Sequence, residues 1–194
     1  AWLPSFLSSA LNVTLSKSSF LSILPYLATV AVTTIVAPTA DKLEAGGMSR
    51  TNVRRLSQSL CFGGGAIALT AVAWVINSTP PEAVTNTTIA TVMTLLTICF
   101  GMGAWVRTGL FCGHQDLSPK YASIMLGTTN TAAAIASTLS TFFTGYFFNL
   151  TGGNWALSLF LPIAFFQAIS VVLFMAFEST PVDFDAEQAK LKAA

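Results

Sequence analysis

The stretch LSQSLCFGGGAIALTAVAWVINSTPP, residues 56–81, contains no Asp, Glu, Lys or Arg. About 20 apolar residues form a helix long enough to cross a hydrocarbon core roughly 30 Å thick. Because the stretch exceeds that length, it predicts one membrane-spanning helix. The fold of the whole chain then depends on how often such stretches recur.

Further charge-free windows cover residues 18–40, 83–106 and 121–177. Charged residues make up 9% of the chain, against roughly a quarter in ordinary globular proteins. Hydrophobic residues reach 53%, and the mean hydropathy is +0.68. The last window is long enough for two spans, with the turn-forming sequence NLTGGNW, residues 149–155, in its middle. This composition predicts an integral membrane protein.

The windows predict an all-α, polytopic transmembrane helix bundle. We expect five full spans, at about 18–40, 56–77, 88–112, 121–148 and 154–177. The apolar residues 1–10 are too few for a span, so we interpret them as the end of a preceding helix in a longer protein, with a trimmed chain as the alternative. The polar residues 179–194 predict a tail outside the membrane.

Basic residues indicate which way the bundle lies in the membrane. Residues 41–55 contain Lys42, Arg50, Arg54 and Arg55, whereas residues 78–87 contain no basic residue. The positive-inside rule therefore places residues 41–55 on the cytoplasmic side, or its equivalent in an organelle. Alternation of the spans places residues 113–120 and a cytoplasmic tail on the same side.

The opposite side collects all four N-x-S/T sequences of the chain. They begin at Asn12, Asn77, Asn86 and Asn149. In a chain this rich in threonine such sequences arise by chance, and luminal glycosylation is the alternative.

Polar groups inside a bilayer are costly, so they are the first candidates for a functional site. Arg107 lies near the end of the third predicted span, where it can extend to the headgroups, form a structural pair, or contact an anionic substrate. Asn130 lies in the fourth span, and its amide needs partners in a low-dielectric setting. Interhelical hydrogen bonding and substrate contact are both open for Asn130.

The fourth span also has two contrasting faces. At steps of three and four residues, one face carries the small or polar residues Asn130, Ala134, Ser137 and Thr141. The other carries Ile124, Ile135, Leu139 and Phe142. Because a polar face is unfavourable toward lipid, we expect it to meet protein or a cavity. Small residues at spacing four, Ser123, Gly127 and Thr131, also suit close helix packing.

The sequence carries no pattern of an enzyme or a metal site. His114 is the single histidine, and the metalloprotease, nucleophile-elbow and P-loop motifs are absent. The spacing of Cys61, Cys99 and Cys112 fits neither a zinc site nor an evident disulfide framework. No basic run suits a nucleic acid. We therefore expect no enzymatic activity, no cofactor or metal, and no nucleic-acid partner.

The segment HQDLSPKYASI, residues 114–124, followed by Gly127 and Asn130, resembles a block of the anion:cation symporter branch of the major facilitator superfamily. That branch includes sialin and the vesicular glutamate, sodium/phosphate and plant plastid phosphate transporters, and this version most resembles the plant plastid type. A second block agrees: SILP at residues 22–25, Ala40-Asp41, and TNVRR at residues 51–55, ahead of Gly63-Gly64.

The resemblance covers nearly the whole chain and implies the C-terminal six-helix half of a major facilitator fold. Residues 1–178 are then a transmembrane half-domain that lacks its N-terminal six-helix partner. The implied activity is secondary active transport of inorganic phosphate or a small organic carboxylate, coupled to sodium or protons by alternating access. Substrate sites in such carriers form between two repeats, so the half-domain alone should not transport.

The resemblance also implies roles for single residues. Those expected near the substrate are Asn130, Thr129, Thr128, Thr108 and Arg107, although Arg107 departs from the neutral residue expected there. Those expected to belong to structural motifs are His114, Asp116, Pro119, Asp41, Arg54 and Arg55. His114, Asp116 and Pro119 are expected to fix a turn and cap the helix that follows.

Two readings compete with coupled transport. A membrane sensor or scaffold of the same fold would not transport, and a channel-like pore would pass ions without coupling. The plastid resemblance favours a thylakoid or envelope membrane, whereas the four N-x-S/T sequences would suit a vesicular or plasma membrane.

Overall fold

The computed structural model describes residues 2–176 and 190–192, and within these residues it contains helices and no strand. The helices up to the second span are α1 (Leu3–Ala10), α2 (Leu15–Leu21), α3 (Ile23–Ala45), α4 (Arg50–Gln58), η1 (Ser59–Gly63) and α5 (Gly64–Ser78). The remaining helices are η2 (Pro81–Ala83), α6 (Asn86–Gly103), η3 (Arg107–Phe111), α7 (Cys112–Leu117), α8 (Ala122–Leu150), η4 (Ala156–Phe160) and α9 (Leu161–Met175).

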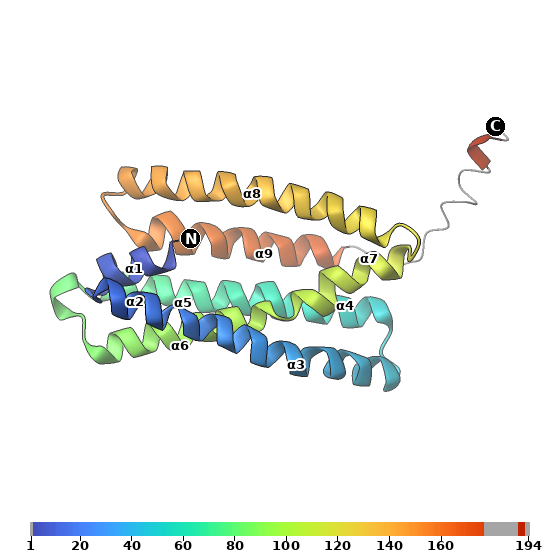
Figure 1. The fold of residues 1–194 in the computed structure, drawn as a ribbon, viewed down its shortest axis with the longest axis horizontal. Helices are drawn as coiled ribbons and strands as arrows, with labels where there is room; N and C mark the ends of the chain where they lie inside the picture. The colour runs from blue at the N-terminus through green and yellow to red at the C-terminus, as the bar shows by residue number, and fades with distance from the viewer. Residues whose placement is uncertain (1, 177–189, 193–194) are drawn as a thin grey trace.

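These helices join end to end into long rods that run side by side (Figure 1). Four rods are long and apolar enough to cross a membrane: 16–45, 50–78, 86–117 and 156–175. They match four of the five predicted spans and confirm an all-α membrane bundle. Helix α8 has 29 residues but is not among the four. Its many Thr, Ser and Asn residues lower its hydropathy, so the fifth span stays a prediction.

The packed core lies where α5 meets α6 and α9, and where α3 meets α6. Val72 of α5 and Val92 of α6 are fully buried there. Helix α1 closes one end of this core, because Phe6 lies between Trp155 and Phe160, at ring-centroid distances of 5.8 and 4.8 Å. Within residues 1–10, Leu3–Ala10 form this helix, while Ala1 lies outside the described residues; that α1 is the end of a longer helix stays a prediction.

Both predicted connections on the basic side are shorter than expected. Helix α3 continues to Ala45 and α4 begins at Arg50, so only residues 46–49 of the predicted 41–55 connection form a turn. The 113–120 connection was likewise wrong in part, because α7 continues to Leu117. Charged side chains do not end a helix when they lie outside the membrane or pair with one another, which is why the charge pattern overestimated both turns.

Three of the rods contain a π-helical turn: η1, η3 and η4. Such turns insert a residue into the helical hydrogen-bond ladder and often occur at functional sites. No sequence pattern predicted these turns, although η1 ends at the first glycine of the Gly63-Gly64-Gly65 run.

Candidate functional site

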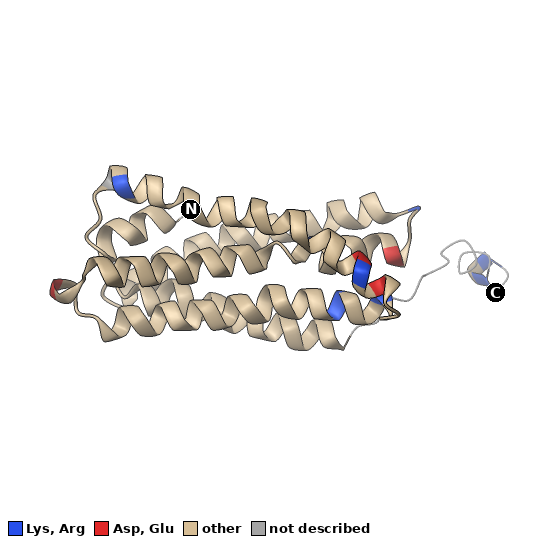
Figure 2. Ribbon diagram, turned by 90° about the horizontal axis from the view of Figure 1, so that it is seen from below, with Lys and Arg blue, Asp and Glu red and all other residues tan. Residues whose placement is uncertain are grey.

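Most of the charged residues of the bundle lie at the end that contains the turns at 46–49 and 118–121 (Figure 2). We call this the charged end. The guanidinium of Arg54 on α4 binds Asp116 of α7, with Nε 2.7 Å from Oδ2, and Glu44 of α3, with Nη1 3.1 Å from Oε1. The side chains of Arg54 and Asp116 are only 9% and 12% exposed. One arginine therefore ties three helices together.

This arrangement corrects the expected role of Asp116. The residue before α8 is Tyr121, and no side chain caps the first turn of that helix. Asp116 instead lies in α7 and accepts a hydrogen bond from Arg54, 62 positions earlier in the chain. The motif acts through a long-range ion pair, and the prediction that it caps α8 was wrong.

His114 of the same motif lies in α7 and is buried. Its Nε2 is 3.2 Å from the hydroxyl of Thr129 on α8. That hydroxyl also lies 3.0 Å from the carbonyl of Met125. Which of the two atoms donates between Nε2 and the Thr129 hydroxyl depends on the tautomer of the imidazole, and the buried Nδ1 has no hydrogen-bond partner.

Thr108 is buried where η3 packs against α4. Its hydroxyl lies 3.2 Å from the hydroxyl of Ser57 and 3.2 Å from the carbonyl of Trp105. Beside it, Gly109 leaves room for Gln58, since a Cβ at Gly109 would lie 2.5 Å from Oε1 of that side chain. Thr108 is therefore satisfied within this helix pair, and the sequence did not indicate the roles of Ser57 and Gln58.

Helix α8 buries only Thr144 along its 29 residues, whereas the 18-residue helix α6 buries five residues. Thr128 and Asn130 are exposed, as are both the polar and the bulky face predicted for this segment. The polar face was expected to meet protein or a cavity, and no other described helix covers it. Gly127 likewise has no neighbour within 4 Å of an added Cβ, so the close packing expected there is absent within the described residues.

The remaining predicted residues lie around the charged end. Arg107 of η3 is exposed, and no ion pair joins it to another described residue. Asp41 and Pro119 are exposed, and Arg55 is half-buried. Within the described chain, the structure therefore joins Thr129 to His114 and Arg54 to Asp116, but it brings neither Thr108 nor Arg107 into contact with Asn130. The predicted tail, apart from residues 190–192, lies outside the described residues.

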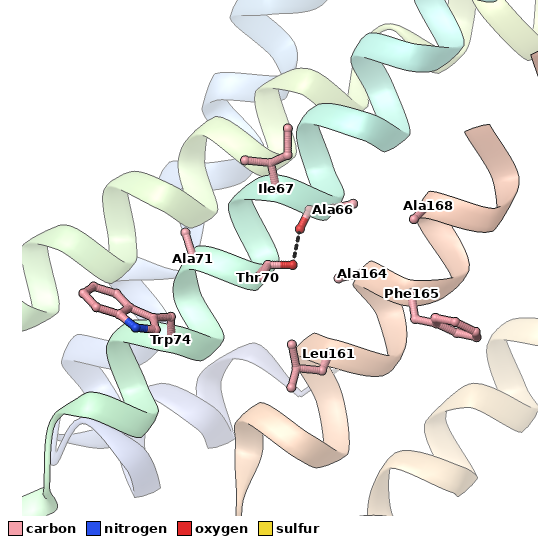
Figure 3. A pocket seen from close by; sticks show the side chains of 9 residues that line it. All are labelled: Ala66, Ile67, Thr70, Ala71, Trp74, Leu161, Ala164, Phe165 and Ala168. Atoms are coloured by element: carbon pink, nitrogen blue, oxygen red, sulfur yellow. Dashed lines mark hydrogen bonds between the residues drawn. The ribbon is translucent and has the colours of Figure 1, made fainter. Parts of the chain in front are cut away.

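A groove of about 860 Å³ lies elsewhere, between α5 and α9 (Figure 3). Its lining is almost entirely apolar and includes four alanines together with Trp74 and Phe165. The hydroxyl of Thr70 is turned inward to the carbonyl of Ala66, 2.8 Å away. Nothing in this lining could neutralise an anion, and none of the predicted site residues contributes to it.

The helix bundle and its buried ion pairs define a multi-pass membrane protein of the all-α class. No protein-family model matches the chain. It is 35% identical, over 97% of its length, to "Probable anion transporter 6, chloroplastic" of Arabidopsis thaliana. It is 36% identical over 79% of its length to the "Ascorbate transporter, chloroplastic" of the same plant. It is 31% identical over 79% of its length to "Sodium-dependent phosphate transport protein 1, chloroplastic", also from Arabidopsis thaliana.

The chain spans 35%, 26% and 28% of the lengths of these three relatives. The matches confirm the resemblance to plant anion transporters that the 114–130 segment predicted. They also confirm that the chain is not an enzyme, because the relatives are named as transporters.

Proposed function

We propose that the protein containing this chain is a secondary transporter of an anion in a plastid membrane. The substrate is inorganic phosphate or a small organic carboxylate, and transport is coupled to sodium or protons by alternating access. In this proposal residues 1–178 are the C-terminal six-helix half of a major facilitator fold, and a further six-helix half completes the pathway. The supporting observation is the relationship, along 97% of the chain, to a protein named as an anion transporter.

The exposed helix α8 supports the same proposal. A 29-residue helix that carries no charge yet buries only Thr144 is unusual, because its hydroxyls and amides have no water in a bilayer core. A second half-domain placed over α8 would enclose this polar surface. The proposed substrate contacts on α8 are then Asn130 and Thr128, with Thr129 between them bonded to His114.

The roles of these residues follow from what an anion needs. The amide of Asn130 and the hydroxyl of Thr128 can donate hydrogen bonds to phosphate or carboxylate oxygens without a fixed charge, whereas the hydroxyl of Thr129 is bonded to His114. Arg107, exposed on η3, supplies the positive charge that attracts the anion. Thr108 follows Arg107 in the chain, and its hydrogen bond to Ser57 holds the backbone of η3 against α4. In this proposal the neutral donors lie on α8 and the single cation on η3, and together they bind the anion reversibly enough for transport.

The decisive experiment is uptake into proteoliposomes that contain the full-length protein. Labelled phosphate, ascorbate and glutamate are offered separately, and sodium and proton gradients are imposed one at a time. We expect accumulation of one anion above its external concentration when one of the two gradients is present. Absence of uptake for every anion would favour the sensor or scaffold, and downhill flux indifferent to both gradients would favour a pore.

Substitution of Asn130 separates the site from the fold. Asn130 is exposed on α8, so Asn130→Ala should leave the helix bundle intact. We expect its KM for the anion to rise about tenfold or more, the loss expected for one or two charge-assisted hydrogen bonds. The matched control is Thr141→Ala, which lies on the same face about three turns away.

A further inference from the structure

The longest helix of the bundle is held to the charged end by one polar contact. Within the described chain, the bond between His114 and Thr129 is the one side-chain hydrogen bond that joins α8 to another helix. At its other end α8 contacts η4, where Phe148 lies 4.4 Å from the ring of Trp155. Between these ends the side chains of α8 are exposed. Packing thus sets the rotation of α8 about its own axis near Phe148, and at the charged end the one polar contact that sets it is the bond to His114.

The rotation of α8 determines which of the residues around Thr129 faces α7. Successive residues of an α-helix point about 100° apart around the axis. When Thr129 faces His114, Thr128 and Asn130 point to either side of the line between the two helices. A rotation by one residue would turn Asn130 toward α7 and remove Thr128 from its place. The contact therefore selects which of three adjacent polar residues faces the bundle.

His114 is itself firmly placed. It is 7% exposed and lies in α7, which the pair of Asp116 with Arg54 fixes to α4. Arg54 in turn binds Glu44 at the end of α3. A continuous series of contacts thus runs from α3 through α4 and α7 to α8. Helix α7 packs against α8, and within the described chain His114 is the α7 residue that hydrogen-bonds the hydroxyl of Thr129.

We infer that His114 is a positioning residue that sets the rotation of α8 and thereby presents Asn130 and Thr128 to the transported anion. The assignment of these two residues to the anion rests on the proposed function, whereas the rotation of α8 does not. The histidine needs no contact with the substrate for this role. Its Nε2 acts on the anion only through Thr129 and the backbone of α8.

The first test measures the rotation directly, without transport. In the full-length protein, Cys61, Cys99 and Cys112 are replaced by alanine, and a single cysteine is placed at position 128 or 130. The labelling rates of the two positions by a membrane-impermeant maleimide give a ratio that reports which residue faces the aqueous pathway. We expect His114→Ala to change this ratio about three- to tenfold, as the loss of one buried hydrogen bond would.

Matched variants separate the hydrogen bond from general damage. Thr129→Val removes the partner hydroxyl from an exposed position and should change the ratio as His114→Ala does, whereas Thr129→Ser should keep it. His114→Gln, whose amide can donate from a similar place, should restore most of the original ratio. Gln115→Ala, an exposed neighbour on α7, serves as the control. An unchanged ratio in both His114→Ala and Thr129→Val would overturn the inference.

If His114→Ala fails to fold, Thr129→Val and Thr129→Ser carry the test alone. The second measurement is anion uptake by His114→Ala and His114→Gln. Mispositioning of Asn130 should raise KM in the alanine variant, with recovery in the glutamine variant. A changed labelling ratio in a protein that transports no anion would support the positioning role and defeat the proposed function. Uptake of an anion together with an unchanged labelling ratio would support the proposed function and overturn the positioning role of His114.

Discussion

The short helix α1 and the long helix α8 use the same kinds of apolar residues in opposite ways. Helix α1 has eight residues, and both Phe6 and Leu7 are 0% exposed. Helix α8 has 29 residues, and Phe142 and Ile124 are each 67% exposed. Helix length and hydrophobicity therefore do not determine how tightly a helix is packed in this protein. What matters is whether a partner helix is present within the chain.

The largest difference in stability is expected when one aromatic side chain is removed from each of the two helices. Phe6→Ala should destabilise the purified protein by about 3 kcal/mol, the low end for such substitutions, because the cavity term remains while part of the water-transfer term is absent in lipid. Phe142→Ala should change stability by less than about 0.5 kcal/mol in this half-domain. Thermal unfolding in detergent measures both. Equal losses would show that α8 is packed as tightly as α1.

The second prediction concerns the stability contribution of Arg54 at the charged end, where α7 connects the packed core to α8. Arg54→Ala leaves the largely buried Asp116 without its cation, while Glu44 keeps only the exposed Arg50, 3.9 Å away. We expect a loss of about 2 kcal/mol, below the roughly 3 to 5 for a fully buried pair, because the Glu44 side chain remains 28% exposed. The loss should also loosen α8, seen as faster hydrogen exchange in residues 122–130.

The control for this prediction is Arg50→Ala. Arg50 lies 3.9 Å from the same Glu44, but its side chain is 68% exposed, so its removal should cost less than about 0.5 kcal/mol. A similar loss in both variants would mean that net charge at this end, and not the buried pair, carries the stability.

Much of the fold could be predicted from sequence because charge is excluded from the hydrocarbon core. The windows at 56–81 and 83–106 contain the whole of α5 and of α6, and the second window matches the ends of α6 to within about three residues. The same signal misplaced the helix ends at Ala45 and Leu117, because outside the core a charged residue can stay helical. Charge exclusion therefore reports where the membrane is, and only indirectly where a helix ends.

The candidate site was harder to predict because its contacts are long-range. The 114–130 segment identified the relevant part of the chain, and the polar face of α8 pointed to a helix with unusual surroundings. No local rule connects Asp116 to Arg54 or places Thr129 against His114, since each pair forms only when separate helices pack. The π-turn at η3 was also unforeseen, because several sequences can insert one residue into a helix.

The smallest expected effect comes from adding the same methyl group to two glycines, one in each kind of environment. At Gly109 the new Cβ would lie 2.5 Å from Oε1 and 3.2 Å from the backbone nitrogen of Gln58, so Gly109→Ala forces η3 away from α4. We expect a loss of about 1 to 2 kcal/mol. At Gly127 on α8 nothing lies within 4 Å, and alanine should stabilise the helix by about 0.5 to 1 kcal/mol.

The sign at Gly127 also depends on what covers α8. In the half-domain alone the space around Gly127 is open, so thermal unfolding should show the gain. In the full-length protein a second half-domain packed on the Ser123, Gly127 and Thr131 face would make the same methyl group clash, and the gain should become a loss. A gain of the same size in both forms would mean that this face of α8 meets lipid, and the partner of α8 would have to lie against its bulky face.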